Sequence, residues 1–144
     1  MTLSAADRLD ILDLLSRADT AAGARDAAAY LALFTPDAVL DGDQGTYRGA
    51  RALAAGVAAV WAAEPAGTLH LTLNPVIDAA PGEEPAAVAR SVLLMIDPGP
   101  PPALVHTAHI TQHLHRDAGG WRIARRTVGT QPAGPAATQP RPEA

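Results

Sequence analysis

The sequence predicts a single α+β domain in which helices come first and an antiparallel sheet follows. Apolar residues recur at helical spacing as far as Ala63, whereas beyond Pro65 apolar and polar residues alternate as they do in strands. A run of helices followed by a run of strands is typical of the α+β class. The chain has 144 residues, which fits one domain with a sizeable core.

The first helix is the clearest predicted element. Ser4 followed three residues later by Asp7 resembles a capping box, in which two side chains satisfy the first backbone N–H groups of a helix. Apolar residues then follow at helical spacing, so the helix is expected over residues 4–22. Gly23 ends it.

Two further helices and a short strand complete the first half. Asp26 is placed to cap a second, short helix, which the Phe34-Thr35-Pro36 segment closes. Residues 38–40 form a short strand, and the glycine-rich segment 41–49 is predicted to be a turn. Residues 50–63 form the third helix.

The second half contains four strand candidates joined by turn-like sequences. They cover residues 68–78, 86–97, 103–116 and 121–128. The connections are rich in Pro, Gly and Asp, so neighbouring strands are expected to be antiparallel. Residues 130–144 are rich in Pro and Ala and have no periodicity, so we expect a domain over residues 1–129 and a disordered tail beyond it.

Composition excludes several classes of function. The net charge of -4 predicts no nucleic-acid partner, and zero cysteines exclude a thiolate nucleophile or a cysteine-ligated metal. A phosphate loop, a dinucleotide fingerprint and a serine-hydrolase elbow are all lacking. No apolar run approaches the about 18 residues of a membrane span, and no targeting segment is visible. We therefore expect a cytoplasmic protein that needs no cofactor or metal.

Several short motifs follow one another at a characteristic spacing. They are Phe34-Thr35-Pro36-Asp37-Ala38, Tyr47-Arg48-Gly49, His70 with Asn74, and Gly120-Trp121-Arg122-Ile123. With these motifs, residues 6–128 resemble SnoaL-like proteins of the nuclear-transport-factor-2-like superfamily. The resemblance implies a cystatin-like α+β barrel, a cone-shaped curved antiparallel sheet wrapped around three N-terminal helices, with an apolar pocket between them. Relatives include scytalone dehydratase, steroid isomerases, polyketide cyclases and limonene epoxide hydrolase, so function must be argued from the pocket.

His70 is the central candidate for catalysis. In its strand the leucines Leu69, Leu71 and Leu73 point one way, and His70, Thr72 and Asn74 point the other. The residues alone leave two alternatives, a solvent-exposed His70 over a leucine core or a His70 that faces a pocket. The resemblance favours the second, with His70 as a general base on the concave face. The leucines would then suit a homodimer interface on the convex face.

The resemblance also implies an aspartate near the end of the first helix that orients the histidine. The matching position is Ala22 or Gly23, and neither can accept a side-chain hydrogen bond. Asp19 lies about one turn earlier and is a possible substitute, although a solvated helix carboxylate is the alternative. This departure keeps open a second hypothesis, a ligand-binding or accessory protein without turnover.

The third predicted strand carries four of the five histidines. His109 shares a face with Thr111, and the resemblance implies that this face lines the pocket, with His109 as an acid or a substrate anchor. His113 and His115 lie nearer the turn and are expected to be solvated. His109 and His113 are about 13 Å apart along a strand, too far to share a metal ion.

The remaining candidates are substrate-binding residues. These are Tyr30, Phe34, Trp61, Asn74 and Thr111, and for each of the aromatic residues core packing is the alternative. The predicted function is a cofactor-independent dehydratase, isomerase or cyclase of secondary metabolism that acts on a small apolar, ring-bearing metabolite. His70 removes a proton, Asp19 orients it, and His109 with Tyr30 stabilises the developing charge. Epoxide hydrolysis would need a carboxylate pair, and the sequence offers none.

Overall fold

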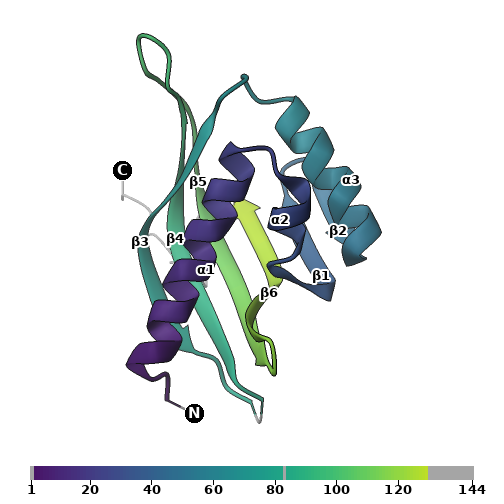
Figure 1. Cartoon of the computed structure of the whole chain (residues 1–144), viewed down its shortest axis with the longest axis vertical. Helices are drawn as coiled ribbons and strands as arrows, with labels where there is room; N and C mark the ends of the chain where they lie inside the picture. Colours follow the sequence, from purple (N-terminus) through teal and green to yellow (C-terminus); the bar gives the residue numbers. More distant parts are fainter. Residues whose placement is uncertain (1, 83, 130–144) are drawn as a thin grey trace, which may run out of the picture.

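The computed structural model describes residues 2–82 and 84–129, and the predicted tail over 130–144 lies outside them. The described residues form three helices and six strands (Figure 1). The helices are α1 (Ala5–Gly23), α2 (Ala27–Leu31) and α3 (Gly49–Ala62). The strands are β1 (Phe34–Gly42), β2 (Gly45–Arg48), β3 (Leu69–Ala79), β4 (Ala86–Asp97), β5 (Ala103–Asp117) and β6 (Gly120–Gly129).

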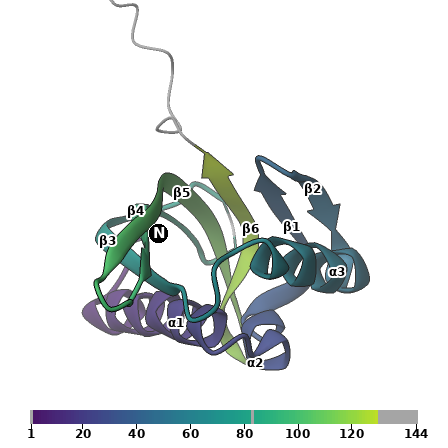
Figure 2. The ribbon, with the colours of Figure 1, turned by 90° about the horizontal axis from the view of Figure 1, so that it is seen from above.

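The strands form one curved, open sheet in the order β2-β1-β6-β5-β4-β3, and the helices lie inside its curve (Figure 2). This confirms the predicted α+β class and the curved sheet around N-terminal helices. The sheet is mixed, however, because β1 pairs parallel to β6 while every other pair is antiparallel. Alternation along a strand indicates which face is buried and not which strand lies beside it, so the parallel pair could not be inferred from the sequence.

The prediction of a turn over residues 41–49 was also wrong. The chain instead continues β1 to Gly42, turns at Asp43 and Gln44, and returns as β2. Residues 34–36, expected to close α2, already belong to β1. Pro36 is accommodated there because the ladder between β1 and β6 is interrupted between Phe34 and Val39, so no N–H is required of it.

Asp7 connects the start of α1 to the sheet through hydrogen bonds. The predicted capping box is confirmed, since Ser4 Oγ accepts from the Asp7 N–H and the Ser4 N–H donates to the Asp7 carboxylate. The same carboxylate accepts from Trp121 Nε1 (3.1 Å) on β6 and from Arg116 on β5. One buried side chain thus satisfies the helix terminus and fixes its position against two strands.

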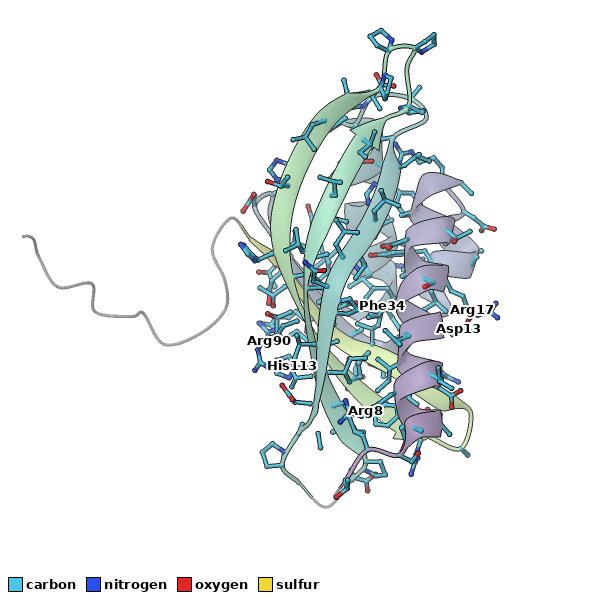
Figure 3. All side chains as sticks on the ribbon, turned by 90° about the vertical axis from the view of Figure 1, so that its left-hand side faces the viewer. Arg8, Asp13, Arg17, Phe34, Arg90 and His113 are labelled. Atoms are coloured by element: carbon cyan, nitrogen blue, oxygen red, sulfur yellow. The ribbon has the colours of Figure 1, made fainter. Side chains whose placement is uncertain are left out.

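The two faces of the sheet differ sharply in burial. The concave face packs against Ile11, Leu15 and Leu53 of the helices, all nearly inaccessible to solvent. On the opposite face of β3, Leu69, Leu71 and Leu73 are 38–44% exposed. Figure 3 shows the same division elsewhere, with Phe34 pointing between sheet and α1 and with Arg90 and His113 projecting away from the helices.

We expect Asp7 to make folding stability depend on acid pH. Hydrogen bonds from the Ser4 side chain and backbone, with Trp121 and Arg116, lower the pKa of Asp7 from 3.8 to about 2. The stabilisation is therefore complete above the ordinary pKa and is lost as pH falls through the lowered one. Asp7→Asn should lower the thermal unfolding midpoint at neutral pH, and the difference from wild type should shrink toward pH 2.

The control for this experiment is Asp10→Asn, which changes an exposed carboxylate of the same helix. Its unfolding midpoint, measured by circular dichroism across the same pH range, should follow that of the wild type. A deficit in Asp7→Asn that stays constant with pH would contradict the assignment.

Candidate active site

A cavity of about 230 Å³ lies between α3, the β1–β2 hairpin and the concave face of the sheet. Apolar side chains form most of its wall, including Leu40, Val57, Trp61, Leu93 and Met95. Its polar side chains include His70, Glu64, Tyr30, Tyr47, His106 and Arg126. An apolar cavity with a few convergent polar groups is the usual form of a small-molecule site.

His70 has a buried carboxylate partner, Glu64. The distance from His70 Nε2 to Glu64 Oε2 is 2.9 Å, and both side chains are less than a tenth exposed. The same Glu64 oxygen forms an ion pair with Arg25, with 2.8 Å between Oε2 and Arg25 Nη1. Because a buried carboxylate needs hydrogen bonds or a counter-charge, Arg25 and His70 together compensate the burial of Glu64.

Local structure brings these three residues together. Glu64 follows α3, and the loop after it turns tightly, with Gly67 at φ 81° and Thr68 Oγ1 donating to the Pro65 carbonyl at 2.7 Å. Arg25 follows α1 in the left-handed region, at φ 57°, and its guanidinium also donates to the Ala22 carbonyl. The end of α1 and the loop before β3 therefore hold the His70 partner from two sides.

The hydrogen bond to Glu64 determines which nitrogen of a neutral His70 carries the proton. A carboxylate can only accept, so Nε2 is the donor and Nδ1 keeps its lone pair. Among the described residues, Nδ1 makes no hydrogen bond. The arrangement leaves one ring nitrogen able to take a proton, while the other is held in place by a charge that stabilises an imidazolium.

Asp19 does not orient His70. Its carboxylate accepts from the Thr72 N–H at 2.6 Å and from Thr72 Oγ1 at 3.1 Å. Burial raises the pKa of the Asp19 carboxyl above its ordinary value, although the bonds from Thr72 oppose the shift. The predicted pairing of Asp19 with His70 was wrong. Thr72 lies two residues after His70 on the same face of β3, and α1 brings Asp19 beside Thr72 instead.

Two of the predicted substrate-binding aromatics line the cavity. Tyr30 and Trp61 meet edge to face with their ring centres 5.3 Å apart. Phe34 does not line the cavity but packs behind Tyr30, at 5.0 Å between centres. Burial raises the pKa of the Tyr30 hydroxyl, so it stays protonated and able to donate.

Three other candidates face away from the cavity. On β5 the inward residues are Ala108, Ile110 and Gln112, so His109 and Thr111 lie on the opposite face. Asn74 joins them there, because the β3–β4 register shifts between Leu73 and Val76 and Asn74 takes a φ of 52°. Their predicted orientation toward the pocket was wrong, and the apolar Ala108 and Ile110 were the residues that indicated the inward face.

Sequence reasoning missed several polar residues of the cavity, above all Glu64 and Arg126. Glu64 lies in a loop, where periodicity gives no direction. Arg126 was hidden by a β-bulge, since Leu114 pairs with Ile123 while His113 pairs with Arg125, leaving an extra residue in β6. The bulge turns Arg126 inward and Arg125 outward, the reverse of simple alternation from Ile123.

Comparison with known families agrees with the fold. The family model described as a SnoaL-like domain matches residues 4–127, so the chain belongs to the SnoaL-like domain family. This confirms the resemblance found in the sequence. No curated protein matches the chain. Within the part that the structure describes, no helix is long and apolar enough to cross a membrane, and no cluster of three potential metal ligands occurs.

Solved structures share the fold. A protein of unknown function with a cystatin-like fold from Nostoc punctiforme is 25% identical, with a TM-score of 0.82 over 94% of this chain and 98% of that chain. Aln2 from a Streptomyces species is 16% identical, with a TM-score of 0.80 over 90% and 94%. ActVI-ORFA from Streptomyces coelicolor is 17% identical, with a TM-score of 0.75 over 85% and 95%. At these low identities the two Streptomyces structures bear on the fold alone.

We expect Gly56 to set the position of the Tyr47 ring in the cavity wall. A Cβ atom at Gly56 would lie 2.5 Å from Tyr47 Cγ, so the ring must move. Overpacking of this kind costs about 1–3 kcal/mol, against about 1 kcal/mol gained from better helix propensity. Gly56→Ala should therefore lower the free energy of unfolding by about 1 kcal/mol in urea denaturation.

The matched control is the same substitution in a Tyr47→Ala background. With the ring removed, only the helix-propensity gain remains, and Gly56→Ala should stabilise by about 1 kcal/mol. The same sign in both backgrounds would show that Tyr47 does not constrain Gly56.

Proposed function

We propose that this protein is a cofactor-independent acid–base enzyme, a dehydratase, isomerase or cyclase, that acts on a small, mainly apolar metabolite in the cavity. The observation that carries the proposal is the His70–Glu64 hydrogen bond at 2.9 Å, buried in the wall of an apolar cavity. A histidine with one nitrogen held by a carboxylate and the other without a partner is the arrangement of a general base.

The chemistry follows from the protonation states. His70 Nδ1 takes a proton from a carbon beside a carbonyl, and the Glu64 carboxylate stabilises the imidazolium that forms. Arg25 supplies a second counter-charge to Glu64 during the step, because its guanidinium lies 2.8 Å from the carboxylate. The proton then returns to another atom of the substrate for isomerisation, or to a departing hydroxyl for dehydration.

Tyr30 is the proposed donor to the oxygen that becomes negative. Its hydroxyl is protonated, its ring is fixed by Trp61, and it lines the same cavity as His70. A fixed donor in an apolar site stabilises developing charge more than a mobile water does. His106 faces the cavity from β5 and takes the acid role that the sequence had assigned to His109.

A binding protein without turnover is the second candidate. One observation favours it, namely that Ala22 or Gly23 stands where the family resemblance implies the orienting aspartate. In this alternative Glu64 and Arg25 only neutralise a histidine that contacts a ligand. The two candidates differ in whether His70 moves a proton.

We expect the protein to accelerate hydrogen exchange next to a carbonyl. A panel of small cyclic ketones and β-hydroxy ketones in D₂O would be followed by proton NMR for loss of the α-hydrogen signal. Wild type should exceed the buffer rate for at least one compound. His70→Ala should slow that exchange about 10²- to 10⁴-fold, the usual contribution of a positioned base, with its fold intact. Glu64→Gln should give a smaller loss.

The control is His109→Ala, which removes a histidine from the opposite face of the sheet. Its exchange rate should equal that of wild type. If wild type exchanges no compound faster than buffer, or if His70→Ala is as fast as wild type, the binding protein becomes the better explanation.

We also propose that two copies pair through the convex face of the sheet. Cross-strand rows on this face are apolar, because Leu71 lies opposite Leu94 and Leu73 lies opposite Val92. Leu69, Leu71, Leu73, Val76 and Leu104 are 38–64% exposed there. A contiguous exposed apolar patch usually marks a contact, and a patch that pairs with itself gives a two-fold dimer.

Light scattering on a size-exclusion column tests the dimer. Wild type should have twice the 14.8 kDa mass of the chain, and the double substitution Leu71→Asp with Leu73→Asp should have the monomer mass. Leu9→Asp is the matched control, since Leu9 is 66% exposed but lies on α1. A monomeric wild type, or a dimer unaffected by the double substitution, would rule out this interface.

A further inference from the structure

We propose that the molecule bound in the cavity carries a carboxylate and that Arg126 is the residue that recognises it. This inference rests on the proposed function in one respect, because it takes the cavity as the substrate site. It adds the substrate class, an apolar organic acid, and a specificity-determining residue.

Arg126 is a buried cation that has no ion-pair partner within residues 2–82 and 84–129. It is 5% exposed and lines the cavity. Its guanidinium has five N–H donors, of which one is used, in a 3.3 Å hydrogen bond to Gln112 Oε1. Among the described residues no carboxylate lies within 4.0 Å of it, whereas Arg25, Arg116 and Arg125 each have one.

Gln112, the hydrogen-bond partner of Arg126, is itself incompletely satisfied. Gln112 Nε2 is buried and makes no hydrogen bond to any described residue, and on β4, two strands from Arg126, the buried Ser91 Oγ also makes none. Both residues lie on the concave face of the sheet, as does Thr72, which binds Asp19. Arg126 lowers the pKa of Asp19 through space, but the Asp19 oxygens already accept from Thr72.

Burying an unpaired charge is costly, so most buried arginines have a carboxylate or phosphate partner. A ligand carboxylate would supply this partner, and its two oxygens match the fork of the guanidinium. The other acidic group deep in the cavity, Glu64, is already held by Arg25 and His70, while Asp43 is exposed. The centre of the Tyr30 ring lies 6.0 Å from Arg126 Cζ. This cation–π contact stabilises the guanidinium but brings no negative charge to neutralise it.

The placement of Arg126 and His70 gives the ligand a direction. Arg126 enters the cavity from β6 and His70 from β3, with β5 and β4 between them in the sheet. The wall between these residues includes Leu93 and Met95. The carboxylate is thus held at one side of the cavity while an apolar body extends toward His70, which leaves the reacting carbon at the far side from the anion.

Matched pairs of acids and amides test the inference by calorimetry at neutral pH. The probes are benzoate with benzamide and 2-naphthoate with 2-naphthamide, which differ in charge but hardly in shape. In wild type the carboxylate of at least one pair should bind about 10-fold or more tightly than its amide. Arg126→Gln should remove this preference, and Arg126→Lys, which keeps the charge but loses the fork, should retain part of it.

The control Arg122→Gln changes a neighbouring arginine of β6 whose nearest carboxylate, Asp117, is 3.8 Å away, and it should keep the full preference. Equal binding of acid and amide by wild type, no binding of any probe, or an unchanged preference in Arg126→Gln would overturn the inference. The wild-type comparison stands even if Arg126→Gln fails to fold. His70→Ala should lose hydrogen exchange but keep the carboxylate preference, so failure here and failure of the proposed catalysis are distinguishable.

Discussion

The candidate site depends on one buried carboxylate oxygen, Glu64 Oε2, which accepts a hydrogen bond from His70 and pairs with the Arg25 guanidinium. A carboxylate shielded from water must be satisfied by the protein, so the end of α1, the loop after α3 and the start of β3 have to meet at this point. That requirement fixes the loop and leaves His70 Nδ1 without a hydrogen-bond partner in the part of the chain that the structure describes. The orientation of the His70 ring therefore follows from the need to satisfy the buried Glu64 carboxylate.

The curvature and the bulges of the sheet decide which other side chains share the cavity with His70. An extra residue in β6 turns Arg126 inward, and a shift in β3 turns Asn74 outward. Because side chains alternate strictly along a regular strand, one added residue exchanges the two faces for everything beyond it. The fold thereby places a cation in an apolar cavity, where it acts most strongly on a ligand.

The two faces of the sheet have different roles in the proposed function. The concave face combines the helices' apolar core with a few buried polar groups, while the convex face exposes a leucine stripe on β3. His70 and Leu71 are adjacent in sequence and belong to these opposite faces. A substitution of His70 therefore alters the cavity, and a substitution of Leu71 alters the convex surface. The proposed catalysis and the proposed association can thus be examined separately.

The sequence by itself determined the α+β class, the capped first helix and the family, because these depend on local periodicity and on motifs at fixed spacing. For His70 the periodicity left two directions open, and the family resemblance favoured the inward one. Only the tertiary structure decided that Glu64 and not Asp19 binds His70, that His109 faces away, and that Arg126 faces in. Those outcomes depend on where a loop folds back and where a strand gains a residue. Neither leaves a periodic signal, because both are set by the packing of segments far apart in the chain.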